Sequence, residues 1–157
     1  MLDPNSETPT NATAQMIGEL NGLLADHFAL YLKTKNFHWH VKGPRFRDLH
    51  LMFDEQAAEI QGQIDVIAER VRKLGGTTLT GIGSIANAMS VTDQDDTTIS
   101  AEDMIAQLRD DNAAMVSKLK SMKEVAESAG DNATDGLLDD WTDAAEERVW
   151  FLSSTLG

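Results

Sequence analysis

The sequence of 157 residues contains no cysteine, only three prolines and few aromatic side chains. Without cysteine, neither a disulfide framework nor a thiolate metal site can form. No stretch approaches the ~20 apolar residues of a membrane span, and residues 1–15 have neither the basic nor the apolar region of a secretory signal. We therefore expect a cytoplasmic protein without membrane attachment, and the scarcity of proline and aromatic residues favours an all-α fold.

Positive charge is scarce as well, with 13 Lys and Arg against 26 Asp and Glu and a net charge of −13 at pH 7. Residues 1–32 contain no Lys or Arg, and residues 131–157 contain Arg148 alone against seven acids. Such a charge attracts cations and opposes contact with nucleic acid. The one basic stretch, from Lys33 to Arg47, indicates favourable charge at a helix C-terminus followed by a solvated loop, with a phosphate-binding patch as the alternative.

Apolar residues recur at helical spacing in four long segments. Ser100 with acids in the following turn marks a helix start, and Gly75–Gly76 and Gly130 mark helix ends. The predicted helices cover residues 13–37, 44–74, 100–128 and 132–154. Residues 1–12, with their low apolar content, are expected to form a flexible tail that precedes a single domain at 13–155.

The connection at 77–99 is rich in Gly, Thr, Ser and Asp and is long enough to cross the end of a helical bundle. Its apolar segment at 82–89 is expected to add a short helix. Gly81 and Gly83 come without the lysine or the preceding strand of a phosphate-binding loop, so no nucleotide site is predicted. Four long helices with one long crossover between the second and the third describe a ferritin-like four-helix bundle.

Two imidazoles and three carboxylates in one stretch carry the potential chemistry of the chain. They are His38, His50, Asp54, Asp65 and Glu69. This ligand set suits iron or another first-row divalent metal. The members of each pair, His50 with Asp54 and Asp65 with Glu69, are four residues apart and share a helix face. At ~1.5 Å per residue, however, the pair centres are roughly 22 Å apart, so no single ion can touch both pairs on one helix.

Either the two pairs serve different sites, or a second copy of the helix supplies the missing half. Two copies placed antiparallel across a two-fold axis would bring His50 and Asp54 of one chain opposite Asp65 and Glu69 of the other. Apolar neighbours on the same helix indicate that this face is covered. We predict two identical metal sites per dimer, with His38 folding back over the turn towards a half-site. The alternative is a structural bundle that carries these residues as surface decoration.

Three other side chains near this region require an interpretation. His27 lies on the apolar stripe of the first helix and is expected to be a hydrogen-bonded core residue. His40 is expected to be exposed in a loop, with a role as a metal ligand as the alternative. Trp39 is expected either to pack over the metal site and act there as a sacrificial electron donor, or to serve in packing alone. The His50-Leu-Met-Phe-Asp54 segment is not the HExxH motif of zinc proteases.

The chain resembles the Dps family, the mini-ferritins named as DNA-binding proteins from starved cells. The resemblance is carried by the segment FHWHVKGPRFRDLHLMFDEQ and by Asp65, AER at 68–70 and LGG at 74–76 after it. The likeness extends over nearly all of residues 13–155. The family's ferroxidase ligands match this chain at His38, at the H-x-x-x-D pair His50 and Asp54, and at the D-x-x-x-E pair Asp65 and Glu69. Leu51 stands where several relatives carry Glu, but that position is not one of these ligands.

The resemblance implies a hollow dodecamer with di-iron ferroxidase sites at its dimer interfaces. It implies that Fe(II) is oxidised, usually with hydrogen peroxide in preference to dioxygen, and stored as ferric mineral, which protects against oxidative damage. Asp131 and Asp135 match the region that lines the family's three-fold entry pores. Members that bind DNA through their ends carry Lys or Arg there, and this chain does not, so weak or absent DNA binding is expected. The alternative is a nucleoid protein that compacts DNA through the Lys33–Arg47 stretch.

Overall fold

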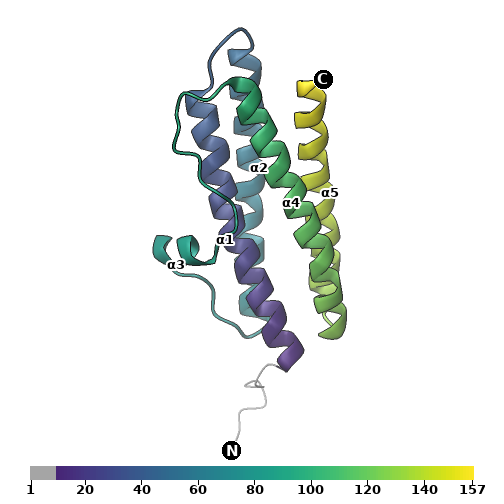
Figure 1. The fold of residues 1–157 in the computed structure, drawn as a ribbon. Coiled ribbons are helices and arrows are strands. Elements are labelled where there is room, and N and C mark those ends of the chain that lie inside the picture. Colours follow the sequence, from purple (N-terminus) through teal and green to yellow (C-terminus); the bar gives the residue numbers. More distant parts are fainter. Residues whose placement is uncertain (1–9) are drawn as a thin grey trace, which may run out of the picture.

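The computed structural model describes residues 10–157, which form five helices and no strand (Figure 1). The helices are α1 (Asn11–His40), α2 (Phe46–Lys73), α3 (Ile82–Ala88), α4 (Ala101–Ser128) and α5 (Asn132–Leu156). The hairpin of α1 and α2 packs beside the hairpin of α4 and α5, and α3 lies on the outside of α1. The all-α four-helix bundle with a short helix in its crossover is thereby confirmed. Most of the expected tail at 1–12 falls outside the described residues.

The first helix is longer than its apolar pattern predicts. It begins at Asn11, where the Thr10 side chain accepts a hydrogen bond from the backbone N–H of Thr13 at 3.1 Å. It continues to His40 because backbone hydrogen bonding persists after the apolar pattern has stopped at Phe37. The expected loop position of His40 was therefore wrong, although its side chain is exposed as predicted.

The turn after α1 depends on Gly43, whose φ of 115° is a value that side chains with a Cβ rarely adopt. The backbone N–H of Phe46 donates to the Gly43 carbonyl at 3.0 Å, and α2 begins at Phe46. Pro44 was expected in the first turn of this helix, but it lies in the tight turn that precedes it. The consequence for function is that the end of α1 is folded directly onto the start of α2.

His27 lies in the apolar core, as predicted, and its side chain is completely buried. Its Nδ1 lies 2.9 Å from the Leu23 carbonyl oxygen, and its Nε2 lies 2.9 Å from the side-chain amide of Gln63. Burial lowers the pKa of His27 from 6.5 to about 4. The ring is therefore neutral at pH 7 and carries a single N–H, so Nδ1 donates to Leu23 and Nε2 can only accept from the amide group of Gln63.

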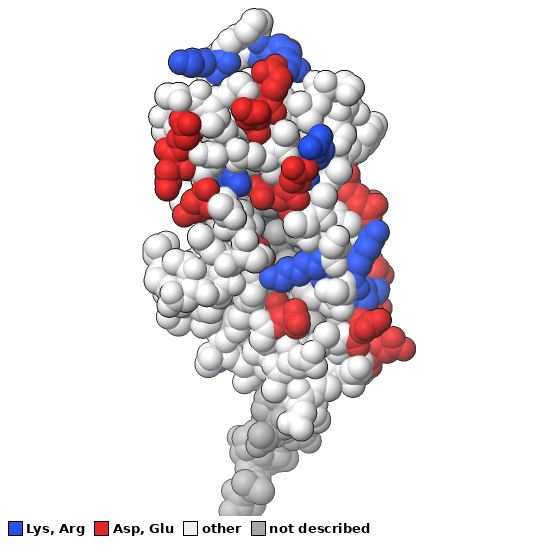
Figure 2. Space-filling model, in the orientation of Figure 1, with Lys and Arg blue, Asp and Glu red and all other residues white. Residues whose placement is uncertain are grey.

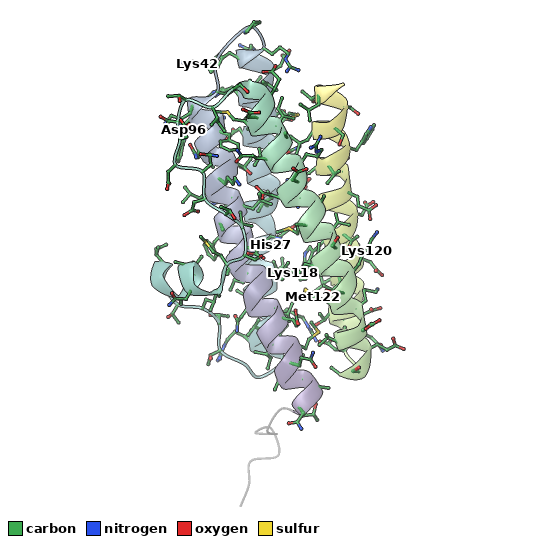
Figure 3. All side chains as sticks on the ribbon, viewed as in Figure 1. His27, Lys42, Asp96, Lys118, Lys120 and Met122 are labelled. Carbon is green, nitrogen blue, oxygen red and sulfur yellow. The ribbon has the colours of Figure 1, made fainter. Side chains whose placement is uncertain are left out.

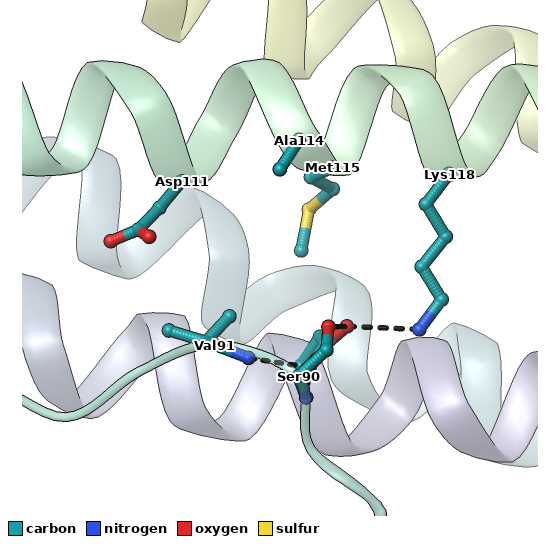
Figure 4. Close-up of a pocket in the computed structure, with 7 residues that line it drawn as sticks. Ser90, Val91, Asp111, Ala114, Met115 and Lys118 are labelled. Carbon is teal, nitrogen blue, oxygen red and sulfur yellow. Dashed lines mark hydrogen bonds and ion pairs between the residues drawn. The ribbon is translucent and has the colours of Figure 1, made fainter.

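Buried charges hold the crossover against α1 and α4 (Figure 4). Asp26 accepts hydrogen bonds from the backbone N–H of Ser90 at 2.6 Å and from its hydroxyl at 2.7 Å, and it pairs with Lys118 at 2.9 Å. Lys33 is only 7% exposed and pairs with Asp111 at 2.8 Å. Its ammonium group also donates a hydrogen bond to the backbone carbonyl oxygen of Thr92 in the crossover. Asp26 and Lys33 thus each have an oppositely charged partner. A buried charge without such a partner would strongly destabilise the fold.

A second buried cation joins the two hairpins. Arg148 of α5 is 2% exposed, and its Nε donates to Asn112 Oδ1 of α4 at 2.7 Å. Its Nη1 donates to the Glu59 carboxylate of α2. One guanidinium group therefore connects three of the four long helices. Across residues 10–157, no helix has both the length and the apolar character needed to cross a membrane.

Candidate metal centre

The tight turn between α1 and α2 brings two predicted ligands, His38 and His50, face to face. Their rings stack with centroids 3.9 Å apart and an angle of 15° between the planes. The Phe46 ring also stacks on His50, at a centroid distance of 5.0 Å. Twelve residues separate the two histidines in the sequence, and the fold of the turn converts that separation into direct contact.

Reciprocal hydrogen bonds set the orientation of both imidazoles. His38 Nδ1 lies 2.6 Å from the backbone carbonyl oxygen of His50, and His50 Nδ1 lies 2.7 Å from the carbonyl oxygen of His38. A carbonyl oxygen can only accept, so each Nδ1 must carry the proton and donate it. In a neutral ring the lone pair is then on Nε2, which is the arrangement that a metal-binding histidine needs.

Asp54 adds a carboxylate to the two histidines. Its Oδ1 lies 3.7 Å from His38 Nε2, and the ammonium group of Lys35 donates to the same oxygen at 2.7 Å. This hydrogen bond from Lys35 lowers the pKa of Asp54 below its ordinary value, so the carboxylate is ionised at neutral pH. His38 thus contacts His50 on one side and lies near Asp54 on the other, and we call these three predicted ligands the histidine half-site.

Asp65 and Glu69 do not join this half-site. Both are exposed on α2, three to four helical turns beyond Asp54. Within residues 10–157, no three histidine or carboxylate side chains gather closely enough to hold a metal ion. Asp65 instead borders a groove between α1 and α2 that is lined mainly by apolar side chains, including Leu24, Phe28 and Ile64. One chain therefore presents two separated parts of the predicted ligand set.

Trp39 points to solvent in the single chain and is 57% exposed. It lines a surface groove together with His40 and the crossover residues Asp93 and Asp95. No apolar cluster of the core includes it, so the chain itself does not pack Trp39 over the half-site. Its role as an electron donor stays a prediction.

The two expected pore residues have structural partners within the chain. Asp131 caps α5 by accepting from the backbone N–H of Thr134 at 3.1 Å, and it pairs with Arg70 at 2.8 Å. Asp135 pairs with Lys123 at 2.8 Å. The capping role could be predicted from the sequence, because Asp is a favoured N-cap residue and Asp131 directly precedes the helix. The pore role of both acids stays a prediction.

The basic stretch is largely neutralised by neighbouring acids. Lys33 is paired with Asp111 and Lys35 with Asp54, while Arg45 binds Glu102 at 3.0 Å. Figure 2 shows basic and acidic side chains intermingled over the face that it presents. Lys35 is also the residue of this site that the sequence interpretation overlooked, although its position three residues before His38 places both on one face of α1.

Comparison with known proteins connects this arrangement to a family. The model of the ferritin-like domain matches residues 17–157. The chain is 36% identical over 137 residues to the DNA protection during starvation protein of Brevibacillus brevis, a match that covers 87% of this chain and 91% of the relative.

Solved structures show the same fold. The crystal structure of a Dps protein from Bacillus brevis is similar with a TM-score of 0.92 and 33% identity, covering 96% of this chain and all of that one. A Dps protein from Vibrio cholerae O1, described as a member of a broad superfamily of ferritin-like diiron-carboxylate proteins, has a TM-score of 0.89 and 26% identity. That match covers 97% of this chain and 99% of the other.

Proposed function

Because the chain belongs to the Dps proteins of the ferritin-like family, we propose that it oxidises Fe(II) and stores the ferric product as mineral inside a hollow dodecamer. Hydrogen peroxide is the preferred oxidant in this proposal, and the protein acts in the cytoplasm to limit oxidative damage. The observation that carries the proposal is the pair of histidines whose Nδ1 protons are committed to backbone carbonyls, which leaves both Nε2 atoms for a metal beside Asp54.

The iron site is completed by a second copy of the chain. The histidine half-site contains only one carboxylate, whereas Asp65 and Glu69 lie roughly 22 Å away along α2. An antiparallel partner places its own Asp65 and Glu69 opposite His50 and Asp54, and the two-fold axis generates a second identical site. The apolar groove beside Asp65 supports this arrangement, because a partner helix would cover it.

The reaction follows from the donor set. Carboxylate oxygens stabilise Fe(III) over Fe(II) because their negative charge interacts more strongly with the higher positive charge, and the imidazoles complete the site without adding charge. Two Fe(II) ions each supply one electron to hydrogen peroxide, whose O–O bond breaks to give two hydroxide ions. The ferric ions then leave for the mineral. Iron is thus the substrate, and both components of hydroxyl-radical chemistry are consumed together.

Rapid mixing tests this function directly. We expect Fe(II) mixed anaerobically with the protein and hydrogen peroxide to give a ferric absorbance rise at least about tenfold faster than in buffer, and faster than with dioxygen. A His40→Ala variant is the control, because His40 bonds within its own helix at Asn36 and lies outside the half-site. Native mass spectrometry of the same sample should give a mass of twelve subunits. A rate equal to that in buffer would reject the proposal.

We further propose that the shell does not bind duplex DNA appreciably at neutral pH. The net charge of −13 repels phosphate, and Lys33, Lys35 and Arg45 are already paired with acids. A gel-shift titration with linear DNA in moderate salt, without added divalent metal, should show no retained complex at micromolar protein. A salt-dependent shift that disappears when Lys42 and Arg47 are changed to Gln would instead favour the nucleoid-protein alternative.

A further inference from the structure

One basic side chain lies within the predicted iron ligands. Lys35 Nζ is 2.7 Å from Asp54 Oδ1, and His38 Nε2 is 3.7 Å from that same oxygen. Lys35 and His38 are three residues apart on α1, so both side chains project from one helix face onto Asp54 of α2. The Lys35 side chain is 22% exposed and that of Asp54 is 51% exposed, so the ion pair lies at the surface where a partner subunit and a metal can approach it.

The contact has two electrostatic consequences. Lys35 donates a hydrogen bond to the Oδ1 oxygen that faces His38 and so takes up one of the acceptor positions of that oxygen. It also places a fixed positive charge within a few ångströms of any cation that Asp54 would bind. The repulsion between a divalent ion and a single charge about 5 Å away in water weakens binding on the order of tenfold.

We propose that Lys35 is the resident counter-ion of the histidine half-site, which Fe(II) must displace from Asp54 in order to bind. Without metal, the ammonium group neutralises Asp54, which would otherwise face the partner's carboxylates. With metal, the flexible four-carbon stem of Lys35 lets the ammonium group withdraw into solvent. This inference rests on the proposed function, because it assigns a role to Lys35 only if Asp54 is an iron ligand.

A different role for the same contact predicts the opposite result. If Lys35 served to orient Asp54 for the metal, its removal would release the carboxylate and weaken metal binding. If Lys35 competes with the metal, its removal strengthens binding. The sign of the change in affinity therefore separates competition from orientation.

The test uses Co(II) as the probe, without any oxidant, so that affinity is measured apart from turnover. Isothermal titration calorimetry of the assembled protein should show about tenfold tighter binding for Lys35→Met than for the parent. Lys35→Arg, which keeps the charge and can still bind the Asp54 carboxylate, should bind Co(II) no more tightly than the parent. The matched control is Lys120→Met, which removes the same charge from an exposed position on α4 (Figure 3) and should leave the affinity unchanged. Equal or weaker binding by Lys35→Met would overturn the inference.

A fourth variant separates this inference from the function on which it rests. In one outcome, the parent binds Co(II) and His50→Ala abolishes that binding, but Lys35→Met has the same affinity as Lys120→Met. The proposed role of Lys35 is then wrong, while the metal site stands. If the parent binds no Co(II), or if His50→Ala binds as well as the parent, then the proposed metal site fails and the role of Lys35 fails with it.

Discussion

A mixture of subunits carrying His50→Ala with subunits carrying Glu69→Ala is expected to regain about one quarter of the parent's rate of rapid Fe(II) oxidation. Each variant alone should fall by at least about tenfold, because every site then lacks a ligand. In a mixed dimer, one site combines both defects, while the other combines the intact half of each chain. Random pairing makes about half of the dimers mixed, and one of the two sites in each is complete.

The measurement requires co-assembly of the two variants followed by stopped-flow mixing with Fe(II) and hydrogen peroxide. The matched control combines His50→Ala with Asp54→Ala. These two residues belong to the same half-site, so every site of a mixed dimer stays defective and no activity should return. Mixed dimers of the first pair that assemble but stay inactive would show that the ligands are not shared between subunits in the manner proposed.

Changing Arg148 to Met is expected to lower the free energy of unfolding by about 3 kcal/mol, because it leaves buried polar partners unmatched. Arg148 is almost fully buried, and its loss removes the donor to Asn112 Oδ1 and the counter-charge of Glu59. Asn112 is itself buried, so its oxygen would lie without a donor in the core. The Glu59 side chain is 37% exposed and can regain water, which keeps the expected loss at the lower end for buried ion pairs.

Urea unfolding at one fixed protein concentration measures this loss, since subunit association contributes to the stability. A double variant, Arg148→Met with Glu59→Met, should recover part of the stability, because no charge is then left without its partner. Arg109→Met is the control. Arg109 lies at the surface beside Asp110, where an ion pair contributes at most about 1 kcal/mol. Equal losses for the Arg148 and Arg109 variants would contradict the structural role assigned to Arg148.

Much of the fold could be predicted because its signals are local. The Ser100 side chain accepts from the backbone N–H of Asp103 at 3.1 Å, so the predicted start of the third long helix is confirmed. Gly130, with a φ of 63°, ends that helix where expected. The boundary at His40 was missed because the helical backbone hydrogen bonds continue past Phe37 through residues whose side chains are not part of the buried apolar stripe.

The contacts of long charged side chains could not be predicted in the same way. Lys33 and Lys35 belong to one basic stretch of the sequence, yet one is buried against Asp111 and the other reaches Asp54 on the neighbouring helix. Asp131 has an ordinary helix-capping position, but its partner Arg70 lies 61 residues earlier in the chain. Which opposite charge each side chain meets depends on how the helices pack, and residue spacing within one helix contains no information on that packing.

By itself, the sequence determined which residue types the predicted metal site can draw on and the helix faces on which they lie, since residues four apart share a face in any α-helix. It also determined that Asp65 and Glu69 are too far from His50 to share an ion within one helix, because the rise per residue is constant. Only the tertiary structure decided that His38 stacks on His50 and that Lys35 takes an oxygen of Asp54. Those contacts join α1 to α2, and the turn at Gly43 and the packing of the two helices create them.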